Sequence, residues 1–519
     1  MITLARAHKM ILMTLVLLLL GCSKPAVEPL DAADDNDLCE GLPCNVFNGF
    51  SGNQESPGVV GATIGGGGQV AFPNMVQGDF GVIGGGKDNL SRNLSVIAGG
   101  FSNAASGLRA FIGGGAHNEA SRDGAVVGGG YANLASQSYT VIGGGTANVA
   151  NGSMAVVGGG SGNLANGRHA TVAGGTHNLV ESAYAVIGGG SYNQATGGTS
   201  TVAGGTRNQA LGIGSAIGGG AGNRADGLQS TVSGGLGNRV SDNYSLVPGG
   251  RGNLAGNAND DPEDAGYATV GGGLDNRAEG AFSVVAGGYA NRASGDFSYT
   301  AGSHALVEAG HPGVILFANS SDYTFTSIAP DEFAVRASGG VRFITALDES
   351  GLPLAGVRLG AGSGTWESLS DRDTKAAIFP VDGRQVLDAL LRLPISTWRY
   401  IGQAGSIRHL GPMAQDFFAL FGLGQDQRYI GALDADGVAL AAIQGVYQLV
   451  QEKDTLIAAL QVENAWQGEQ LADLEARLAA LEKRADPTRS SILTLLVAAL
   501  SLSLGGYSRA ASETVSFGL

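Results

Sequence analysis

Small, apolar and polar positions recur along this chain with a period of fifteen residues. Asparagine marks the period, and every interval is fifteen apart from one step of fourteen and one gap of 23. The repeated asparagines are Asn74, Asn89, Asn103, Asn118, Asn133, Asn148, Asn163, Asn178, Asn193, Asn208, Asn223, Asn238, Asn253, Asn276 and Asn291. A period this strict predicts a solenoid in which each repeat forms one coil.

Within each repeat, an Ile or Val follows a small residue by two positions, as in Ala110 and Ile112 or Ala155 and Val157. Residues two apart in a strand share one face, so we expect this column to line the interior of a narrow roll. The glycines that follow suit a tight corner. The asparagine column is expected at another corner, where Asn tolerates left-handed backbone geometry and its amides can stack along the solenoid. A single narrow roll has a small core, which favours packing of three rolls.

The repeat Asn-x-Ala-x-Gly-x-x-Ala-x-Val-x-Gly-Gly resembles the head repeat of trimeric autotransporter adhesins (YadA-like) over about residues 62–303. The resemblance implies a left-handed parallel β-roll that trimerises and binds host or matrix surfaces. We assign residues 62–310 to this roll, with Asn103, Asn118, Asn133, Asn148 and Asn163 as its structural repeat residues. An insertion at 257–268 interrupts the period and reads as a solvated loop, with a ligand or cation contact as the alternative.

Short alternating stretches at 311–365 predict a β neck, and a group of ordered motifs follows at 366–450. These motifs include Trp366-Glu-Ser-Leu-Ser370-Asp371-x-x-x-Lys375 and His409-Leu-Gly-Pro-Met-Ala-Gln-Asp416. They resemble the intramolecular chaperone domain of phage tail spikes and endosialidases, a small α+β domain.

The resemblance implies that Ser370 and Lys375, with Asp371 in the same motif, cut the chain's own backbone beside Ser370 after a trimer has formed. A serine hydroxyl is a weak nucleophile until a base takes its proton, and a lysine can be that base when burial lowers its pKa. We expect the Leu369–Ser370 bond to be cut once, with no external substrate. The alternative is that Ser370 and Asp371 only cap a turn. His409 and Asp416 lack a Gly-x-Ser-x-Gly partner and are interpreted as structural.

Residues 451–485 predict a coiled-coil helix, because apolar residues occupy both core positions of a heptad. One position carries Val450, Ile457, Asn464, Leu471 and Leu478, and the other carries Leu460, Leu474 and Leu481. The apolar segment 490–507 has two interpretations, a second membrane contact or a helix buried in the oligomer, and residues 508–519 form a tail.

At the N-terminus, Arg6 and Lys9 precede an apolar run that ends in Leu-Leu-Gly-Cys22. This order is typical of a secretory signal, here residues 1–21, and the run resembles the lipobox of bacterial lipoproteins. The resemblance implies a lipid on Cys22 and, with Ser23 after it, an outer-membrane location on the cell surface. Residues 22–61 read as an acidic tether, and Cys39 and Cys44 as a disulfide loop.

The composition of the chain argues against several classes of function. The formal net charge of −15 argues against nucleic acid as a partner. Neither a phosphate-binding loop nor a metal-ligand cluster occurs in the sequence, so we expect no metal and no other cofactor. The sequence as a whole predicts a mainly β, lipid-anchored, homotrimeric surface fibre, adhesive or structural. The alternatives are a phage-derived tail-fibre or spike module that binds a receptor, and a monomeric solenoid scaffold.

Overall fold

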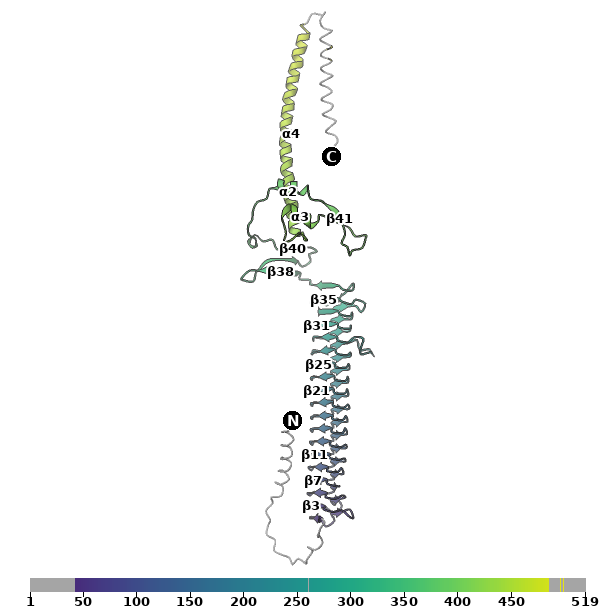
Figure 1. Ribbon diagram of the computed structural model, residues 1–519. Coiled ribbons are helices and arrows are strands. Elements are labelled where there is room, and N and C mark those ends of the chain that lie inside the picture. The colour runs from purple at the N-terminus through teal and green to yellow at the C-terminus, as the bar shows by residue number, and fades with distance from the viewer. Residues whose placement is uncertain (1–42, 260, 485–494, 496–497, 499–519) are drawn as a thin grey trace, which may run out of the picture. The chain divides into compact units, whose positions relative to one another are not determined.

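The structure is a computed structural model that describes residues 43–259, 261–484, 495 and 498. The chain divides into two compact units, with the boundary between Gly339 and Gly340. The first unit is a parallel β-solenoid, visible in Figure 1 as a stack of short arrows from β3 to β35. The second unit contains small antiparallel sheets and helices.

Each coil of the solenoid contributes one strand to each of two parallel sheets. The odd-numbered strands form a 19-stranded sheet, and the even-numbered strands pair in succession to form the second sheet. The odd-numbered strands are β1 (Val46–Phe47), β3 (Thr63–Ile64), β5 (Val82–Ile83), β7 (Val96–Ile97), β9 (Phe111–Ile112), β11 (Val126–Val127), β13 (Val141–Ile142), β15 (Val156–Val157), β17 (Thr171–Val172), β19 (Val186–Ile187), β21 (Thr201–Val202), β23 (Ala216–Ile217), β25 (Thr231–Val232), β27 (Leu246–Val247), β29 (Thr269–Val270), β31 (Val284–Tyr289), β33 (Tyr299–Ser303), β35 (Ile315–Ala318) and β37 (Phe333–Arg336). The even-numbered strands are β2 (Gln54–Glu55), β4 (Met75–Val76), β6 (Leu90–Ser91), β8 (Ala104–Ala105), β10 (Glu119–Ala120), β12 (Leu134–Ala135), β14 (Val149–Ala150), β16 (Leu164–Ala165), β18 (Leu179–Val180), β20 (Gln194–Ala195), β22 (Gln209–Ala210), β24 (Arg224–Ala225), β26 (Arg239–Val240), β28 (Leu254–Ala255), β30 (Arg277–Ala278), β32 (Arg292–Ala293), β34 (Ala305–Val307) and β36 (Phe325–Thr326).

The interior column is the one that the alternation predicts. Ile112 and the Ala110 before it are fully buried, and so are their equivalents in the neighbouring coils. The first residue of each odd-numbered strand, such as Phe111 or Val126, points outward and stays exposed or half-buried. Because neighbouring coils repeat the same side chain at 15-residue register, the interior is a stack of identical contacts.

The backbone angles at the corners of the coils differ from the expectation that the asparagines themselves adopt left-handed geometry. From Asn89 onward, left-handed backbone geometry occurs at the residue before each repeated asparagine, for example His117 (φ 59°) and Ala132 (φ 55°), and not at Asn118 or Asn133. Glycine is required at the preceding corner: Gly130 has φ 94°, and a Cβ there would lie 2.1 Å from the carbonyl oxygen of Gly145. Asparagine is therefore required at this position for the hydrogen bonds of its side chain, and not for its ability to adopt left-handed backbone angles.

Those side chains form a buried amide ladder. Asn118 Nδ2 donates to the carbonyl oxygens of Gly114 (3.0 Å) and Gly130 (2.9 Å). Its Oδ1 accepts the backbone N–H of Asn133 at 3.1 Å and the Asn133 side-chain amide at 3.0 Å. Each amide thus donates to one corner carbonyl of its own coil and to one of the next coil, and it accepts one backbone N–H from the next coil. These groups are buried, so water cannot take the place of the amide.

The solenoid extends beyond the expected range at both ends. Residues 46–55 already pair as β1 and β2, within the segment interpreted as tether. Parallel pairing also continues past residue 310 to β37, within the segment interpreted as neck. Asn53 begins the amide ladder, since its Oδ1 accepts the N–H of Asn74. It stands 21 residues before Asn74, so a search for a 15-residue period does not find it.

The second unit begins with the antiparallel strands β38 (Val341–Leu347), β39 (Pro353–Leu359) and β40 (Trp366–Ser368). A 3-10 turn, η1 (Arg372–Thr374), leads to α2 (Gly383–Leu390), the hairpin of β41 (Ser396–Trp398) with β42 (His409–Gly411), α3 (Ala414–Phe421) and α4 (Ala432–Glu482). Leu393, Phe417 and Val438 form a small core between these elements. Helices α2 and α4 touch closely, because a Cβ on Gly445 would lie 2.3 Å from the carbonyl oxygen of Gly383.

Several expectations lie outside the described residues: the signal at 1–21, the lipid on Cys22, the tail at 508–519 and most of 490–507. Cys44 is disulfide-bonded, while Cys39, its expected partner, lies outside the described range. Within the described residues, none of the helices combines the length and the apolar character needed to cross a membrane.

Candidate active site

Ser370 lies just after the end of β40. The last ladder bond before it runs from the N–H of Leu369 to the carbonyl oxygen of Gly356, at 2.9 Å. This hydrogen bond holds the Ser368–Leu369 peptide group, one residue before the Leu369–Ser370 bond, where the three-stranded sheet stops. The bond expected to be cut therefore lies between the end of β40 and the capped 3-10 turn η1.

A single 3-10 turn brings Lys375 back to Ser370. Lys375 Nζ donates to Ser370 Oγ at 2.5 Å. The turn is closed by the N–H of Lys375, which donates to the carbonyl oxygen of Arg372 at 3.1 Å. The five-residue spacing in the sequence is thus the spacing that lets one turn place an amine on a hydroxyl.

Asp371 holds the turn in place. Its Oδ1 accepts the N–H of Asp373 at 3.1 Å, and the Thr374 hydroxyl donates to its carbonyl oxygen at 2.9 Å. The carboxylate caps η1 and forms no hydrogen bond or ion pair with the Ser370 hydroxyl or the Lys375 amine in the described part of the chain. Asp371, expected with the dyad, therefore contacts the backbone of the turn that carries Lys375.

Both members of the pair are exposed in the single chain. Ser370 and Lys375 are open to water, and Leu369 is 38% exposed. Water competes for the proton of an exposed hydroxyl and stabilises a charged amine. The contact between the amine and the hydroxyl is therefore present in a single chain, where both groups face water.

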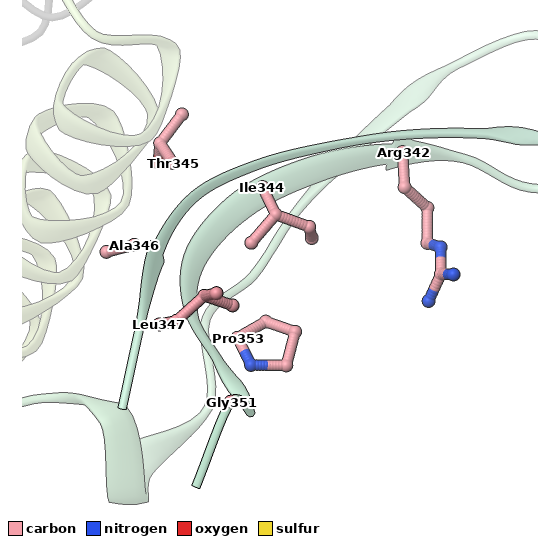
Figure 2. A pocket seen from close by; sticks show the side chains of 7 residues that line it. All are labelled: Arg342, Ile344, Thr345, Ala346, Leu347, Gly351 and Pro353. Atoms are coloured by element: carbon pink, nitrogen blue, oxygen red, sulfur yellow. The ribbon is translucent and has the colours of Figure 1, made fainter. Parts of the chain in front are cut away.

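A hollow of about 330 Å³ lies next to Ser370 and is lined by residues of all three strands. Its polar groups include Arg342 on β38, Arg358 on β39 and Glu367 on β40. A larger hollow of about 800 Å³ shares Arg342, Ile344 and Pro353 with the smaller one and extends toward the turn between β38 and β39, as Figure 2 shows. Arg342 is the one charged residue that lines the larger hollow, whereas Arg358 and Glu367 also line the smaller one.

The other sequence candidates lie apart from the pair. His409 packs on the Trp398 ring with centroids 4.7 Å apart, and its Nε2 lies 2.9 Å from Gln403 Oε1. Asp416 stands in the first turn of α3. Neither approaches a serine hydroxyl in the described contacts, in line with the structural interpretation.

The insertion in the solenoid packs over a buried carboxylate. Asp242 is wholly buried: its Oδ2 accepts the N–H of Asn257 at 2.9 Å, and its Oδ1 has no hydrogen-bond partner. Burial raises the pKa of the Asp242 carboxyl, and the nearby Asp264 and Asp261 carboxylates raise it further. Asp264 itself accepts the side-chain amide of Asn259 at 2.7 Å. Among the described residues, no group of three acidic, histidine or cysteine side chains is arranged to hold a metal ion.

Comparison with known proteins identifies part of this unit. Residues 370–422 match the model of a protein family described as chaperone of endosialidase. The match begins at Ser370 and runs through η1, α2, the β41–β42 hairpin and α3. No curated protein matches the chain.

One feature of the site could not be found from the sequence. Arg342, Arg358 and Glu367 are far apart along the chain and belong to no motif, and only the strand register places them in one row. A periodic pattern could have shown the strands, but not which residues face each other across them.

Proposed function

We propose that this protein is a lipid-anchored, homotrimeric surface fibre whose C-terminal unit drives trimerisation and then cuts the chain at the Leu369–Ser370 bond. The observation that carries the proposal is the 2.5 Å contact between Lys375 Nζ and Ser370 Oγ, at the start of the segment that matches the endosialidase chaperone family. The parallel solenoid supplies the fibre.

The proposed cleavage uses groups of this chain and one water molecule. Lys375, as a neutral amine, takes the proton of the Ser370 hydroxyl, and Oγ attacks the carbonyl carbon of Leu369. The C–N bond breaks as Lys375 returns the proton to the Ser370 nitrogen, which leaves an ester between Leu369 and Ser370 Oγ. Water then hydrolyses the ester, giving a carboxylate on Leu369 and a free hydroxyl and amino group on Ser370.

Exposed apolar side chains support assembly into a trimer. Along α4, Leu460, Leu474 and Leu481 are 52–60% exposed in the single chain, although they fill one core position of the heptad. The outward column of the odd-numbered sheet is also apolar over several successive coils, as at Val126, Val141 and Val156. Association would remove both surfaces from water. Shielding of the pair by neighbouring chains would link cleavage to correct assembly.

A row of stacked aromatic rings supports an adhesive role for the stalk. Tyr244, Tyr267, Phe282 and Phe297 stack on one another with centroids 4.9–5.1 Å apart. Their side chains are 43–64% exposed. Aromatic residues at such density on a surface are typical of protein contact sites. The likeness of the repeat to adhesin heads points the same way, and the lipobox-like run at Cys22 supports the lipid anchor.

The decisive test is expression of the full chain with Ser370→Ala, Lys375→Met and, as a matched control, Ser368→Ala two residues before the proposed nucleophile. Intact mass and a denaturing gel should show two pieces meeting at Leu369–Ser370 in wild type and control. The Ser370→Ala and Lys375→Met chains should stay whole. An intact wild-type chain in a folded trimer, or a Ser370→Ala chain that is still cut, would exclude the mechanism.

The match to the chaperone family also fits a phage-type tail-fibre module. A lipid on Cys22 would distinguish the proposed surface fibre from that alternative. In a Gram-negative host, the mature N-terminal peptide of the wild type should begin at Cys22 with added acyl mass. Cys22→Ser should release the protein from the membrane fraction. A wild-type chain that keeps residues 1–21 and stays out of the membrane fraction would favour the tail-fibre alternative.

A further inference from the structure

The three-stranded sheet beside Ser370 places two arginines directly opposite each other. The antiparallel register pairs Arg342 on β38 with Arg358 on β39, and Arg358 in turn with Glu367 on β40. Residues directly opposite in an antiparallel pair share one face of the sheet, and like charges in that position repel. This row therefore carries two positive charges and one negative charge.

The single carboxylate of the row is already engaged. Glu367 Oε2 lies 2.6 Å from Arg358 Nε. Arg342 forms no hydrogen bond or ion pair with the described residues. Figure 2 shows its side chain on the same side of the curved strand as Ile344, with Thr345 on the other side. One guanidinium on this face thus lacks an anionic partner.

Leu369 reaches the same face. It stands two residues after Glu367, so it has the same orientation in the strand, and its N–H is held by the carbonyl oxygen of Gly356. It is the diagonal neighbour of Arg358, a relation that spans about 7–8 Å between Cα atoms and is within reach of long side chains. Arg342, Arg358, Leu369 and Ser370 all line the hollow of about 330 Å³.

We propose that Arg342, together with Arg358, is a binding site for the main-chain carboxylate that cleavage leaves on Leu369. The inference rests on the proposed cleavage at Leu369–Ser370. Hydrolysis turns a neutral peptide carbonyl into a carboxylate, because a chain terminus is ionised at neutral pH. The row then holds two guanidinium groups and two carboxylates, and its charges balance.

The ligand chemistry suits arginine. A guanidinium binds a carboxylate through two parallel N–H···O bonds, and such charge-assisted bonds are roughly twice as strong as neutral ones. Cleavage removes the covalent continuation of β40, a strand of three residues that is followed directly by the exposed Leu369. Capture of the new carboxylate keeps this strand in the sheet, so the mature fibre retains an ordered end after the C-terminal piece separates.

The test compares Arg342→Gln in two backgrounds, the cleaving chain and the uncleaved Ser370→Ala chain. Hydrogen exchange of the peptide covering residues 366–369 is followed by mass spectrometry in the full-length trimer. Arg342→Gln should speed exchange about tenfold in the cleaved protein, since a charge-assisted bond is lost there. It should leave exchange unchanged in the Ser370→Ala chain, where no terminal carboxylate exists. Arg342→Lys should restore part of the protection.

Arg358→Gln is the matched comparison. It breaks the pair with Glu367 and should speed exchange in both backgrounds. If Arg342→Gln speeds hydrogen exchange equally in both backgrounds, or in neither, the carboxylate site is excluded. The proposed cleavage is not affected by that result. If Arg342→Gln prevents cleavage, the arginine acts before the carboxylate exists and the inference fails. An uncleaved wild-type chain, seen in the same mass spectra, would refute the proposed function itself.

Discussion

At the scale of single residues, the asparagine ladder shows why the period is so strict. Each asparagine is buried and bonded to glycine carbonyls of its own coil and the next, and to the backbone N–H of the following asparagine. The other amino acids lack a side chain that both donates twice and accepts at this length and shape. A substitution leaves several buried backbone groups without partners at once.

Asn148→Ala is expected to destabilise the neighbouring coils by roughly 3 kcal/mol, because two carbonyls and one N–H lose their partner in a buried site. Gly144 and Gly160 supply those carbonyls, at 3.0 and 2.9 Å from Asn148 Nδ2. Asn151→Ala, an exposed asparagine in the same coil, is the control and should change stability by less than about 0.5 kcal/mol. Hydrogen exchange of residues 140–170 measures both, and equal effects would contradict the ladder's role.

Asp242 gives the solenoid a defined pH dependence. Because burial raises the pKa of its carboxyl in the folded state, the carboxyl contributes stability at low pH and loses it as pH rises through the raised value. Asp242→Asn should therefore raise the melting temperature at pH 7 by a few degrees and remove this part of the pH dependence. Asn retains an oxygen for the N–H of Asn257.

The control for this prediction is Asp296→Asn, an exposed carboxylate that also accepts a backbone N–H, from Ala281 at 2.9 Å. It should leave the melting temperature at pH 7 unchanged or slightly lower. Thermal denaturation between pH 4 and pH 8 separates the two variants. An Asp242→Asn protein that melts lower than wild type at pH 7 would show that the charged form is stabilising.

At the scale of elements, α4 is longer than the predicted coiled coil. The helix starts at Ala432, so the heptads from residue 450 onward continue a helix that packs on α2 within the compact domain. Its first turns are held by the domain core through Val438, whereas the apolar side chains of its later turns are not covered by any of the described residues. One element thus serves two packing environments.

The heptad seam is expected to control assembly through α4. Leu474→Lys, at a core position, should convert the proposed trimer to monomer at micromolar concentration, because it places three lysine charges in one layer of the apolar core. Val462→Lys is the control: this residue is 72% exposed, more than the 60% of Leu474, but it stands outside the seam. Sedimentation equilibrium gives the mass, and a trimer with Leu474→Lys would refute the seam.

At the scale of the whole molecule, assembly is expected to come before cleavage. The Ser370–Lys375 pair has its geometry in one chain but is exposed to water there. Leu474→Lys should therefore lower the fraction of cut chains at least tenfold, while Val462→Lys should cut as wild type does. The ratio of cut to intact chains on a denaturing gel measures this. Complete cleavage of a monomeric Leu474→Lys protein would show that cleavage does not require assembly.

The sequence by itself determined the solenoid, because a fifteen-residue period repeats one small set of contacts and needs no distant information. The resemblance of its motifs to the chaperone family indicated the Ser370–Lys375 pair, and the structure brings these two side chains together through one local turn. Tertiary structure alone decided where the solenoid begins, since Asn53 enters the ladder off the period. It also decided the row of Arg342, Arg358 and Glu367, because cross-strand register depends on how three strands align and not on any one of them.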